Sequence, residues 1–127
     1  MTDKILIVED DESILEVLKI ILRRAGYETT GFSNGKAVMQ DEFDTPNLFL
    51  LDKQLAGIDG LDICRHLKER TETKDIPVIM ISANPQIGLL SAEAGADGYI
   101  EKPFTIEGLL STIRSHIQKN DEARLIV

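Results

Sequence analysis

Five short apolar runs, each followed by a segment with helical periodicity, constrain the fold of this chain more than any other feature. The runs lie at 5–8, 27–32, 48–51, 77–81 and 98–101. Strands that alternate with helices favour a parallel sheet, because each parallel pairing needs a crossover connection, and such crossovers are right-handed. The sequence therefore predicts a five-stranded parallel sheet with helices packed on both of its faces.

Helical periodicity also indicates which side chains face this sheet. The first helix is expected to end at Gly26, and Ser33 or Asn34 is expected to cap a short second helix. The third helix is predicted to point Leu61, Cys64 and Leu67 inward and Arg65, Lys68 and Glu69 outward. A fourth helix, interrupted by proline and glycine, is expected over about 85–94. Thr105 caps the last helix, whose predicted inward face consists of Ile106, Leu109, Leu110, Ile113 and Ile117. The predicted architecture is a flavodoxin-like three-layer α/β sandwich.

Length and composition indicate one globular domain. We expect it to span residues 1–120, with 121–127 as either frayed helix or the start of a linker. No apolar run is long enough to cross a bilayer and the first residues lack the pattern of a signal peptide, so we expect a cytoplasmic protein with no membrane partner. The single cysteine, Cys64, excludes an internal disulfide and is expected to be a buried, inert thiol.

Polar residues stand where the predicted strands end. Glu9 and Asp10 follow the first strand, Asp52 closes the third, Ser82 the fourth and Lys102 the fifth. Ligands of such sheets bind outside the carboxyl ends of the strands, where the strand order reverses. We therefore expect these side chains to converge on one site.

A cluster of carboxylates at that edge predicts a divalent cation. Glu9, Asp10 and Asp52 would repel one another in a partly desolvated cleft, and a hard cation removes the conflict. Mg²⁺ prefers one or two carboxylates with a carbonyl, water and phosphate oxygens, so Asp10, Asp52 and a backbone carbonyl just after Asp52 suit it, with Glu9 acting through water. The net charge of −8 agrees with this and disfavours direct binding of nucleic acid.

The same residues suit phosphoryl transfer, which needs an in-line nucleophile and positive charge around the transferred group. Asp52 is the candidate nucleophile beside the metal. Lys102 could neutralise one phosphoryl oxygen, and the Ser82 hydroxyl could hydrogen-bond another.

The chain resembles the receiver domains of two-component response regulators, the family of the chemotaxis regulators, over nearly its whole length. The motifs are Ile-Leu-Ile-Val-Glu-Asp-Asp at 5–11, Leu-Leu-Asp at 50–52, Gly-Ile-Asp-Gly at 57–60, Ile-Ser-Ala at 81–83, Ala-Gly-Ala-Asp-Gly-Tyr at 94–99 and Lys-Pro-Phe at 102–104. The resemblance implies the following roles: Glu9 and Asp10 as the acidic pair, Asp52 as phosphoacceptor, the Gln54 carbonyl as a metal ligand, Ser82 and Tyr99 as switch residues, and Lys102 as the phosphate-sensing cation. It also implies a cis bond before Pro103, and a dephosphorylation rate set by Gln54 and Asn84.

Three departures from the family pattern bear on the loops around this site. Lys53 follows the acceptor where an apolar residue is usual, and Ala56 stands where proline is common. The stretch from Ser82 to Gly95 is short and contains a proline and a glycine, which argues against a regular fourth helix.

Several polar residues have simpler explanations. Asp11 is assigned to capping the first helix, and Asp59 and Asp62 to starting the third. His66 and His116 are expected to be solvated on polar helical faces. For Tyr99 the simpler alternative to the switch role is an ordinary half-buried strand tyrosine.

The predicted function is a signalling switch rather than a turnover enzyme: it accepts a phosphoryl group from a sensor histidine kinase or phosphotransfer protein onto Asp52, and it loses that group again. An aspartyl-phosphate phosphatase or phosphotransferase is the alternative, but it would usually carry a second acid where Gln54 stands. A flavin carrier on the same fold would need a glycine-rich phosphate loop in place of the acidic loop. The downstream protein is not identified, and a homodimer through the fourth helix, fifth strand and fifth helix stays open.

Overall fold

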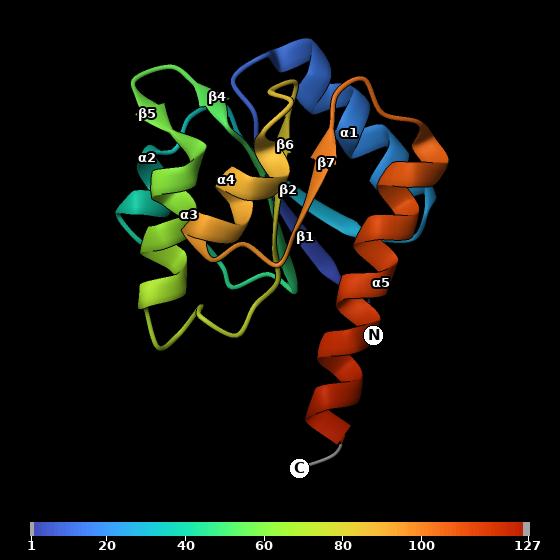
Figure 1. Cartoon of the computed structure of the whole chain (residues 1–127). Coiled ribbons are helices and arrows are strands. Elements are labelled where there is room, and N and C mark those ends of the chain that lie inside the picture. The colour runs from blue at the N-terminus through green and yellow to red at the C-terminus, as the bar shows by residue number, and fades with distance from the viewer. Residues whose placement is uncertain (1, 126–127) are drawn as a thin grey trace.

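The computed structural model describes residues 2–125, which form one central sheet covered by helices on both sides (Figure 1). The strands are β1 (Lys4–Val8), β2 (Glu28–Phe32), β3 (Leu48–Asp52), β4 (Gln54–Leu55), β5 (Ile58–Asp59), β6 (Val78–Ser82) and β7 (Gly98–Glu101). The helices are α1 (Glu12–Arg24), α2 (Lys36–Met39), α3 (Gly60–Glu69), α4 (Ile87–Ala94) and α5 (Ile106–Leu125).

The main sheet is parallel, with five strands in the order β2-β1-β3-β6-β7. The strand order reverses between β1 and β3, because the chain first adds β2 on one side of β1 and then continues on the other. All five strands point the same way, with their carboxyl ends toward the top of Figure 1. The predicted flavodoxin-like architecture is confirmed.

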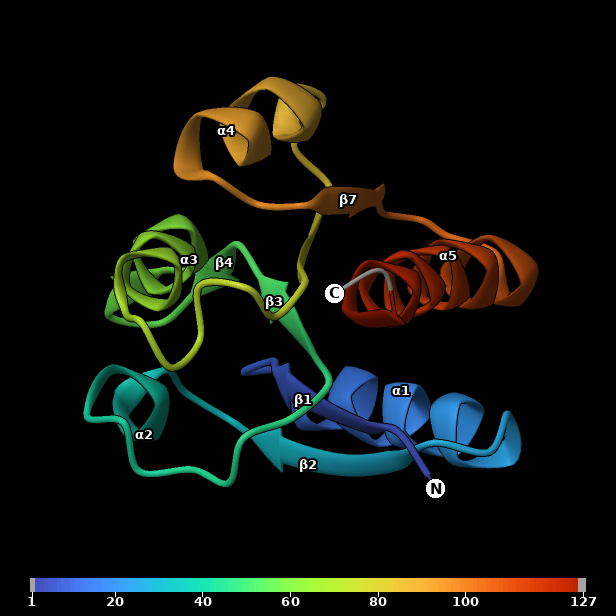
Figure 2. The same cartoon turned by 90° about the horizontal axis from the view of Figure 1, so that it is seen from below.

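Figure 2 shows helices on both sides of the main sheet, and an apolar core fills the space on each side. One core lies between the sheet and the pair α1 and α5, and the other lies between the sheet and α2, α3 and α4. All five residues of β3 are buried, since this central strand is covered on both faces. The predicted buried position of Cys64 is confirmed, and burial raises the pKa of its thiol to about 11, which favours the unreactive protonated form.

Local capping explains where the helices begin. The Asp11 carboxylate accepts hydrogen bonds from the backbone N–H groups of Ser13 and Ile14 at 2.9 and 3.2 Å, so its predicted capping role is confirmed. The Thr105 hydroxyl accepts from the Gly108 N–H at 2.9 Å and caps α5 in the same way. The helix α5 then runs through Leu125, so the predicted tail is helical as far as that residue.

Some predicted boundaries differ from the structure. The strand β2 begins at Glu28 rather than Tyr27, and β6 covers 78–82 rather than 77–81. A regular α4 is present, but it begins at Ile87, because Asn84 forms a turn in which its side chain accepts the Gln86 N–H and its carbonyl accepts the Ile87 N–H. The antiparallel hairpin of β4 and β5 was not predicted, because each of its strands has only two residues.

Four side chains also lie otherwise than predicted. Ile106 stands at the exposed start of α5 with 55% of its surface accessible, rather than on its inward face. Lys68 points toward the protein, where its ammonium contacts the Asp97 carboxylate at 2.6 Å. His66 pairs with Asp41 at 2.8 Å. The two ring nitrogens of His116 lie 2.8 and 3.0 Å from the carbonyl oxygens of Thr112 and Asp97, so neither histidine is simply solvated.

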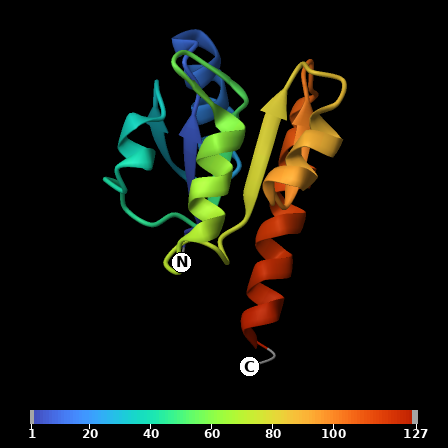
Figure 3. The ribbon, with the colours of Figure 1, turned by 60° about the vertical axis from the view of Figure 1, so that its left-hand side comes forward.

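Within residues 2–125, helices long and apolar enough to span a bilayer are absent. Seen from the side, α3 and α4 stand in front of the sheet, and the β4–β5 hairpin lies above α3 at the carboxyl end of the strands (Figure 3).

Candidate phosphoacceptor and metal site

The loops after β1, β3 and β7 bring four of the predicted site residues together. The Lys102 ammonium lies 2.8 Å from Asp52 Oδ2 and 3.3 Å from Glu9 Oε1. Carboxylate oxygens of Glu9, Asp10 and Asp52 lie within 4.8 Å of one another. The predicted convergence of acids and a cation at this edge of the sheet is therefore present.

The position of Asp52 follows from the central place of β3 in the sheet. The residue before it, Leu51, pairs with Val8 of β1 on one side and with Met80 of β6 on the other. Asp52 itself pairs with Ile81 of β6. These apolar strands bury the Asp52 residue to 2% exposure. A buried carboxylate needs compensating partners, and here the Gln54 backbone N–H donates to Oδ1 at 2.8 Å while Lys102 holds Oδ2.

Lys102 reaches this carboxylate from the end of β7. Its backbone N–H donates to the Ser82 carbonyl at 2.9 Å, which continues the β6–β7 ladder by one residue. The predicted cis bond between Lys102 and Pro103 is present. Burial by itself lowers the pKa of the Lys102 ammonium, but its hydrogen bond to Asp52 and the charges of Asp52 and Glu9 raise that pKa above its ordinary value. Lys102 is thus a fixed positive charge at the site.

The environment of Glu9 strongly favours its protonated form. Burial, the hydrogen bond with Asp52 and the charge of Asp52 raise its pKa to about 8, although Lys102 opposes the shift. Its Oε2 atom is buried and has no hydrogen-bond partner among residues 2–125. A buried acceptor without a donor destabilises the folded state by about 1 to 3 kcal/mol. A cation, a proton or a water molecule at this oxygen would remove that cost.

The donor set fits Mg²⁺. Three carboxylates at a solvent-facing edge supply the hard oxygen ligands that Mg²⁺ prefers, and the unpaired Glu9 oxygen is suited to a water of its hydration shell. Asp10 is exposed, which leaves room for such waters. Gln54 follows Asp52 closely in the chain, and the role of its carbonyl as a further ligand stays a prediction.

Ser82 lies at the end of β6, beside the cluster, and is 1% exposed. Its hydroxyl oxygen accepts the Asn84 backbone N–H at 3.0 Å, which leaves the hydroxyl proton free to be donated elsewhere. Tyr99 does not join the cluster. It is 46% exposed and lies over Gly88 of α4, where a β-carbon would come within 3.0 Å of the tyrosine ring.

Two features of this site were missed by sequence reasoning. The Ala56 backbone N–H donates to Asp10 Oδ2 at 3.1 Å, and no residue type signals such a bond. Gly60 packs so closely on the Asp52 carbonyl that a β-carbon there would overlap it. The Gly57-Ile58-Asp59-Gly60 motif was the available signal for that close approach.

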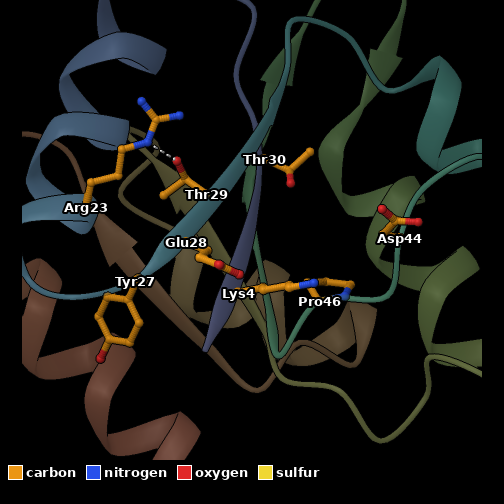
Figure 4. Close-up of a pocket in the computed structure, with 8 residues that line it drawn as sticks. All are labelled: Lys4, Arg23, Tyr27, Glu28, Thr29, Thr30, Asp44 and Pro46. Atoms are coloured by element: carbon orange, nitrogen blue, oxygen red, sulfur yellow. Dashed lines mark hydrogen bonds between the residues drawn. The ribbon is translucent and has the colours of Figure 1, made fainter. Parts of the chain in front are cut away.

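A separate cavity of about 470 Å³ lies along the outer edge of β2 (Figure 4). Its lining residues are Lys4, Arg23, Tyr27, Glu28, Thr29, Thr30, Asp44 and Pro46. The Arg23 side chain donates to the Thr29 hydroxyl across it at 2.8 Å. The predicted site residues are elsewhere, so this cavity and the carboxylate cluster are distinct places on the molecule.

Comparison with known proteins agrees with the geometry. The family described as "Response regulator receiver domain" matches residues 5–114. The "DNA-binding response regulator MtrA" of Mycobacterium tuberculosis is 35% identical over 125 residues, which cover 96% of this chain and 54% of that protein. The "Sensory transduction protein RegX3" of Mycobacterium bovis is 36% identical over 93% of this chain and 52% of its own length. The chain thus spans about half the length of these curated relatives.

Solved structures extend the likeness to the fold. A CheY-like response regulator receiver domain protein from Methanospirillum hungatei has a TM-score of 0.83 and 31% identity, covering 97% of this chain and 99% of that one. The receiver domain of a sensor histidine kinase from Pseudomonas aeruginosa, described with a magnesium ion coordinated in its active site cleft, has a TM-score of 0.84 and 26% identity over 93% of this chain and 99% of that one. This chain belongs to the response regulator receiver domain family of two-component signalling systems.

Proposed function

We propose that this receiver domain accepts a phosphoryl group on Asp52 with the help of Mg²⁺, and that Glu9, Asp10, Asp52 and the Gln54 carbonyl hold the ion. The observation that carries the proposal is the meeting of three carboxylates with the Lys102 ammonium at the carboxyl edge of the sheet. Mg²⁺ would supply positive charge against the phosphoryl oxygens and let the acids share one site.

Each protein group has a distinct part in the transfer. Asp52 is held at both oxygens, by the Gln54 N–H and by Lys102, so it is oriented before the phosphodonor arrives. A carboxylate oxygen attacks phosphorus as the bond between phosphorus and the donor breaks, and the electron pair of that bond leaves with the donor, which takes up a proton. Lys102 then pairs with a phosphoryl oxygen instead of with Asp52, and Ser82 donates its free hydroxyl proton to another.

This exchange of partners supports a switch in which Ser82 and Tyr99 report the phosphorylated state. Ser82 is buried beside Asp52, whereas Tyr99 is exposed on the neighbouring strand against α4. A shift of Ser82 toward the phosphoryl group changes the end of β6 next to α4 and β7. Exposed Leu89 and Tyr99 lie on that face, which suits contact with a protein, including a second copy of the chain.

Membership of the receiver family supports a proposal for the wider role. We propose a sensor histidine kinase or phosphotransfer protein as phosphodonor, a cytoplasmic location, and the receiver unit within 1–120. MtrA is described as DNA-binding, but this chain has a net charge of −8, so we propose that it acts through protein contacts rather than by binding nucleic acid itself. The Gln54 residue, where an aspartyl-phosphate phosphatase would usually carry a second acid, supports a switch over a turnover enzyme.

The direct test is covalent labelling with a small phosphodonor such as acetyl phosphate. With Mg²⁺ present, intact-mass spectrometry should show one added phosphoryl group that is stable in acid and labile in base. Asp52→Asn should abolish it, while Asp62→Asn, which removes an exposed acid from α3, should be labelled like the parent protein. Undiminished labelling of Asp52→Asn would remove Asp52 as the acceptor.

A further inference from the structure

The loop from Lys53 to Asp59 connects the phosphoacceptor to α3 and contains the β4–β5 hairpin. Its strands of two residues pair only with each other, and an isolated hairpin of this size is marginal in water. Its placement against the carboxylate cluster therefore depends on contacts made by its side chains and its ends. We propose that the Lys53–Asp59 ion pair is the positioning device that holds this loop in the geometry needed for Mg²⁺ binding; the inference rests on the function proposed above.

The base of the loop is closed by Lys53 in two ways. Its ammonium lies 3.1 Å from Asp59 Oδ2, and its carbonyl accepts the Gly60 backbone N–H at 2.9 Å. The Lys53 side chain is 13% exposed and the Asp59 side chain is 40% exposed, so the pair is shielded from water on the lysine side and open on the aspartate side. Asp59 is itself fixed, because its Oδ1 accepts the Leu61 N–H as the cap of α3. Lys53 thus ties the exit of β3 to the start of α3.

The rest of the loop touches two of the three carboxylates directly. The Gln54 N–H donates to Asp52 Oδ1 at 2.8 Å, and the Ala56 N–H donates to Asp10 Oδ2 at 3.1 Å. For Asp10 this is the hydrogen bond that orients its carboxylate among residues 2–125. Groups that orient metal ligands in this way typically change metal affinity by about 10- to 100-fold.

The affinity for Mg²⁺ should depend on the position of this loop. The ion demands near-octahedral geometry, so small displacements of an oxygen ligand weaken binding. If the loop loses its base contact, the Gln54 carbonyl and the orienting N–H of Ala56 move together, because only Leu55 stands between these two residues. The positioning role is therefore a property of the pair and not of the lysine charge alone.

Because Lys53 is positively charged, a purely electrostatic role and a positioning role predict opposite changes in Mg²⁺ affinity when the lysine is replaced. If Lys53 acted only through its charge, removing it would take a cation away from the neighbourhood of Mg²⁺ and would tighten binding. If it acts by holding the loop, Lys53→Met should weaken Mg²⁺ binding. Asp59→Asn keeps an oxygen that can cap α3 but removes the ion pair, so it should weaken binding as well.

The experiment is a Mg²⁺ titration of the whole chain by isothermal calorimetry, with NMR hydrogen exchange of the backbone amides in the metal-free state. Lys53→Met and Asp59→Asn should each lower the Mg²⁺ affinity about tenfold, and the double variant should lose no more than either alone. Exchange at Ala56 and Gly60 should speed up selectively. Lys53→Arg should restore the affinity, and Lys19→Met, which breaks a 3.4 Å pair on α1, should bind like the parent.

Equal or tighter Mg²⁺ binding by Lys53→Met would overturn the inference while leaving the proposed function intact. A loss in Lys53→Met that is absent from Asp59→Asn would also overturn it, because Lys53 would then act without its partner. A parent protein that binds no Mg²⁺ would overturn this inference together with the metal-assisted function on which it rests.

Discussion

At the scale of single residues, the site holds carboxylates that repel one another, and binding of one divalent cation would remove this repulsion. Glu9 and Asp52 are both buried, and one ammonium serves both of them. Like charges in a desolvated place favour the protonated form of one acid, and the rise in the Glu9 pKa to about 8 expresses this. Adding a divalent cation should reverse the preference, because the ionised carboxylates then have a partner.

We predict that Mg²⁺ binding releases a proton from Glu9. Below about pH 8 the metal-free protein holds that proton, so the apparent Mg²⁺ affinity should rise as the pH is raised from about 6 to about 8 and then level off. Calorimetric titrations in two buffers with different ionisation enthalpies should give different apparent heats near pH 7. The difference should disappear in Glu9→Gln, and identical heats for the parent would contradict the prediction.

The raised pKa of Glu9 also determines whether the metal-free protein gains or loses stability as the pH rises. The folded Glu9 pKa of about 8 lies above its ordinary value of 4.5, so the folded state binds the proton more tightly. The Glu9 contribution to the free energy of unfolding is therefore fully present below about pH 4.5 and is lost as the pH rises through about 8. In urea unfolding with a chelator, Glu9→Gln should gain stability relative to the parent between pH 5 and pH 8. A difference that stays constant over this range would count against the shift.

At the scale of elements, a partly buried lysine joins α3 to the connections around β6. The Lys68 ammonium donates to the carbonyls of Lys74 and Ile76 at 3.2 and 2.9 Å and pairs with Asp97 at 2.6 Å. The Asp97 carboxylate also accepts the Val78 N–H at 2.8 Å. All three ammonium protons therefore have acceptors, and this end of the sheet, opposite the phosphoacceptor, is held by polar contacts.

We predict that Lys68→Met lowers the free energy of unfolding by about 1 to 3 kcal/mol, because it leaves shielded acceptors without a donor. Chemical denaturation monitored by circular dichroism is a suitable measurement. Lys74→Met is the matched control, since the Lys74 side chain is exposed, and it should change stability by less than about 0.5 kcal/mol. Equal changes in the free energy of unfolding for the two substitutions would show that the contacts of the Lys68 ammonium do not stabilise the fold.

At the scale of the whole molecule, one sheet unites two cores into a single unit. Leu50 faces the core beneath α1 and α5, while its neighbours Phe49 and Leu51 face the core beneath the other helices. Because both cores share β3, a destabilising substitution in either core should lower the free energy of unfolding of the whole domain. Small domains of this size usually unfold in one cooperative step.

Leu50→Ala is therefore predicted to destabilise the entire domain by about 2 to 5 kcal/mol, as buried leucine truncations do. Fluorescence-detected and circular-dichroism-detected unfolding should still coincide in one transition. Leu89→Ala removes the same atoms from a residue that is 63% exposed and should cost less than about 0.5 kcal/mol. Separate transitions for the two faces would contradict the single-unit description.

The sequence by itself determined the five strands of the main sheet, the five helices and the order in which Glu9, Asp10, Asp52, Ser82 and Lys102 reach one edge of the sheet. These features follow from local periodicity and from the rule that parallel strands end together. Only the tertiary structure decided that Lys68 turns inward, that His116 meets the Asp97 carbonyl and that the Ala56 N–H orients Asp10. Local patterns describe which way a residue faces on its own element, whereas a long polar side chain or a backbone N–H finds its partner far along the chain, and that partner exists only once the layers have packed.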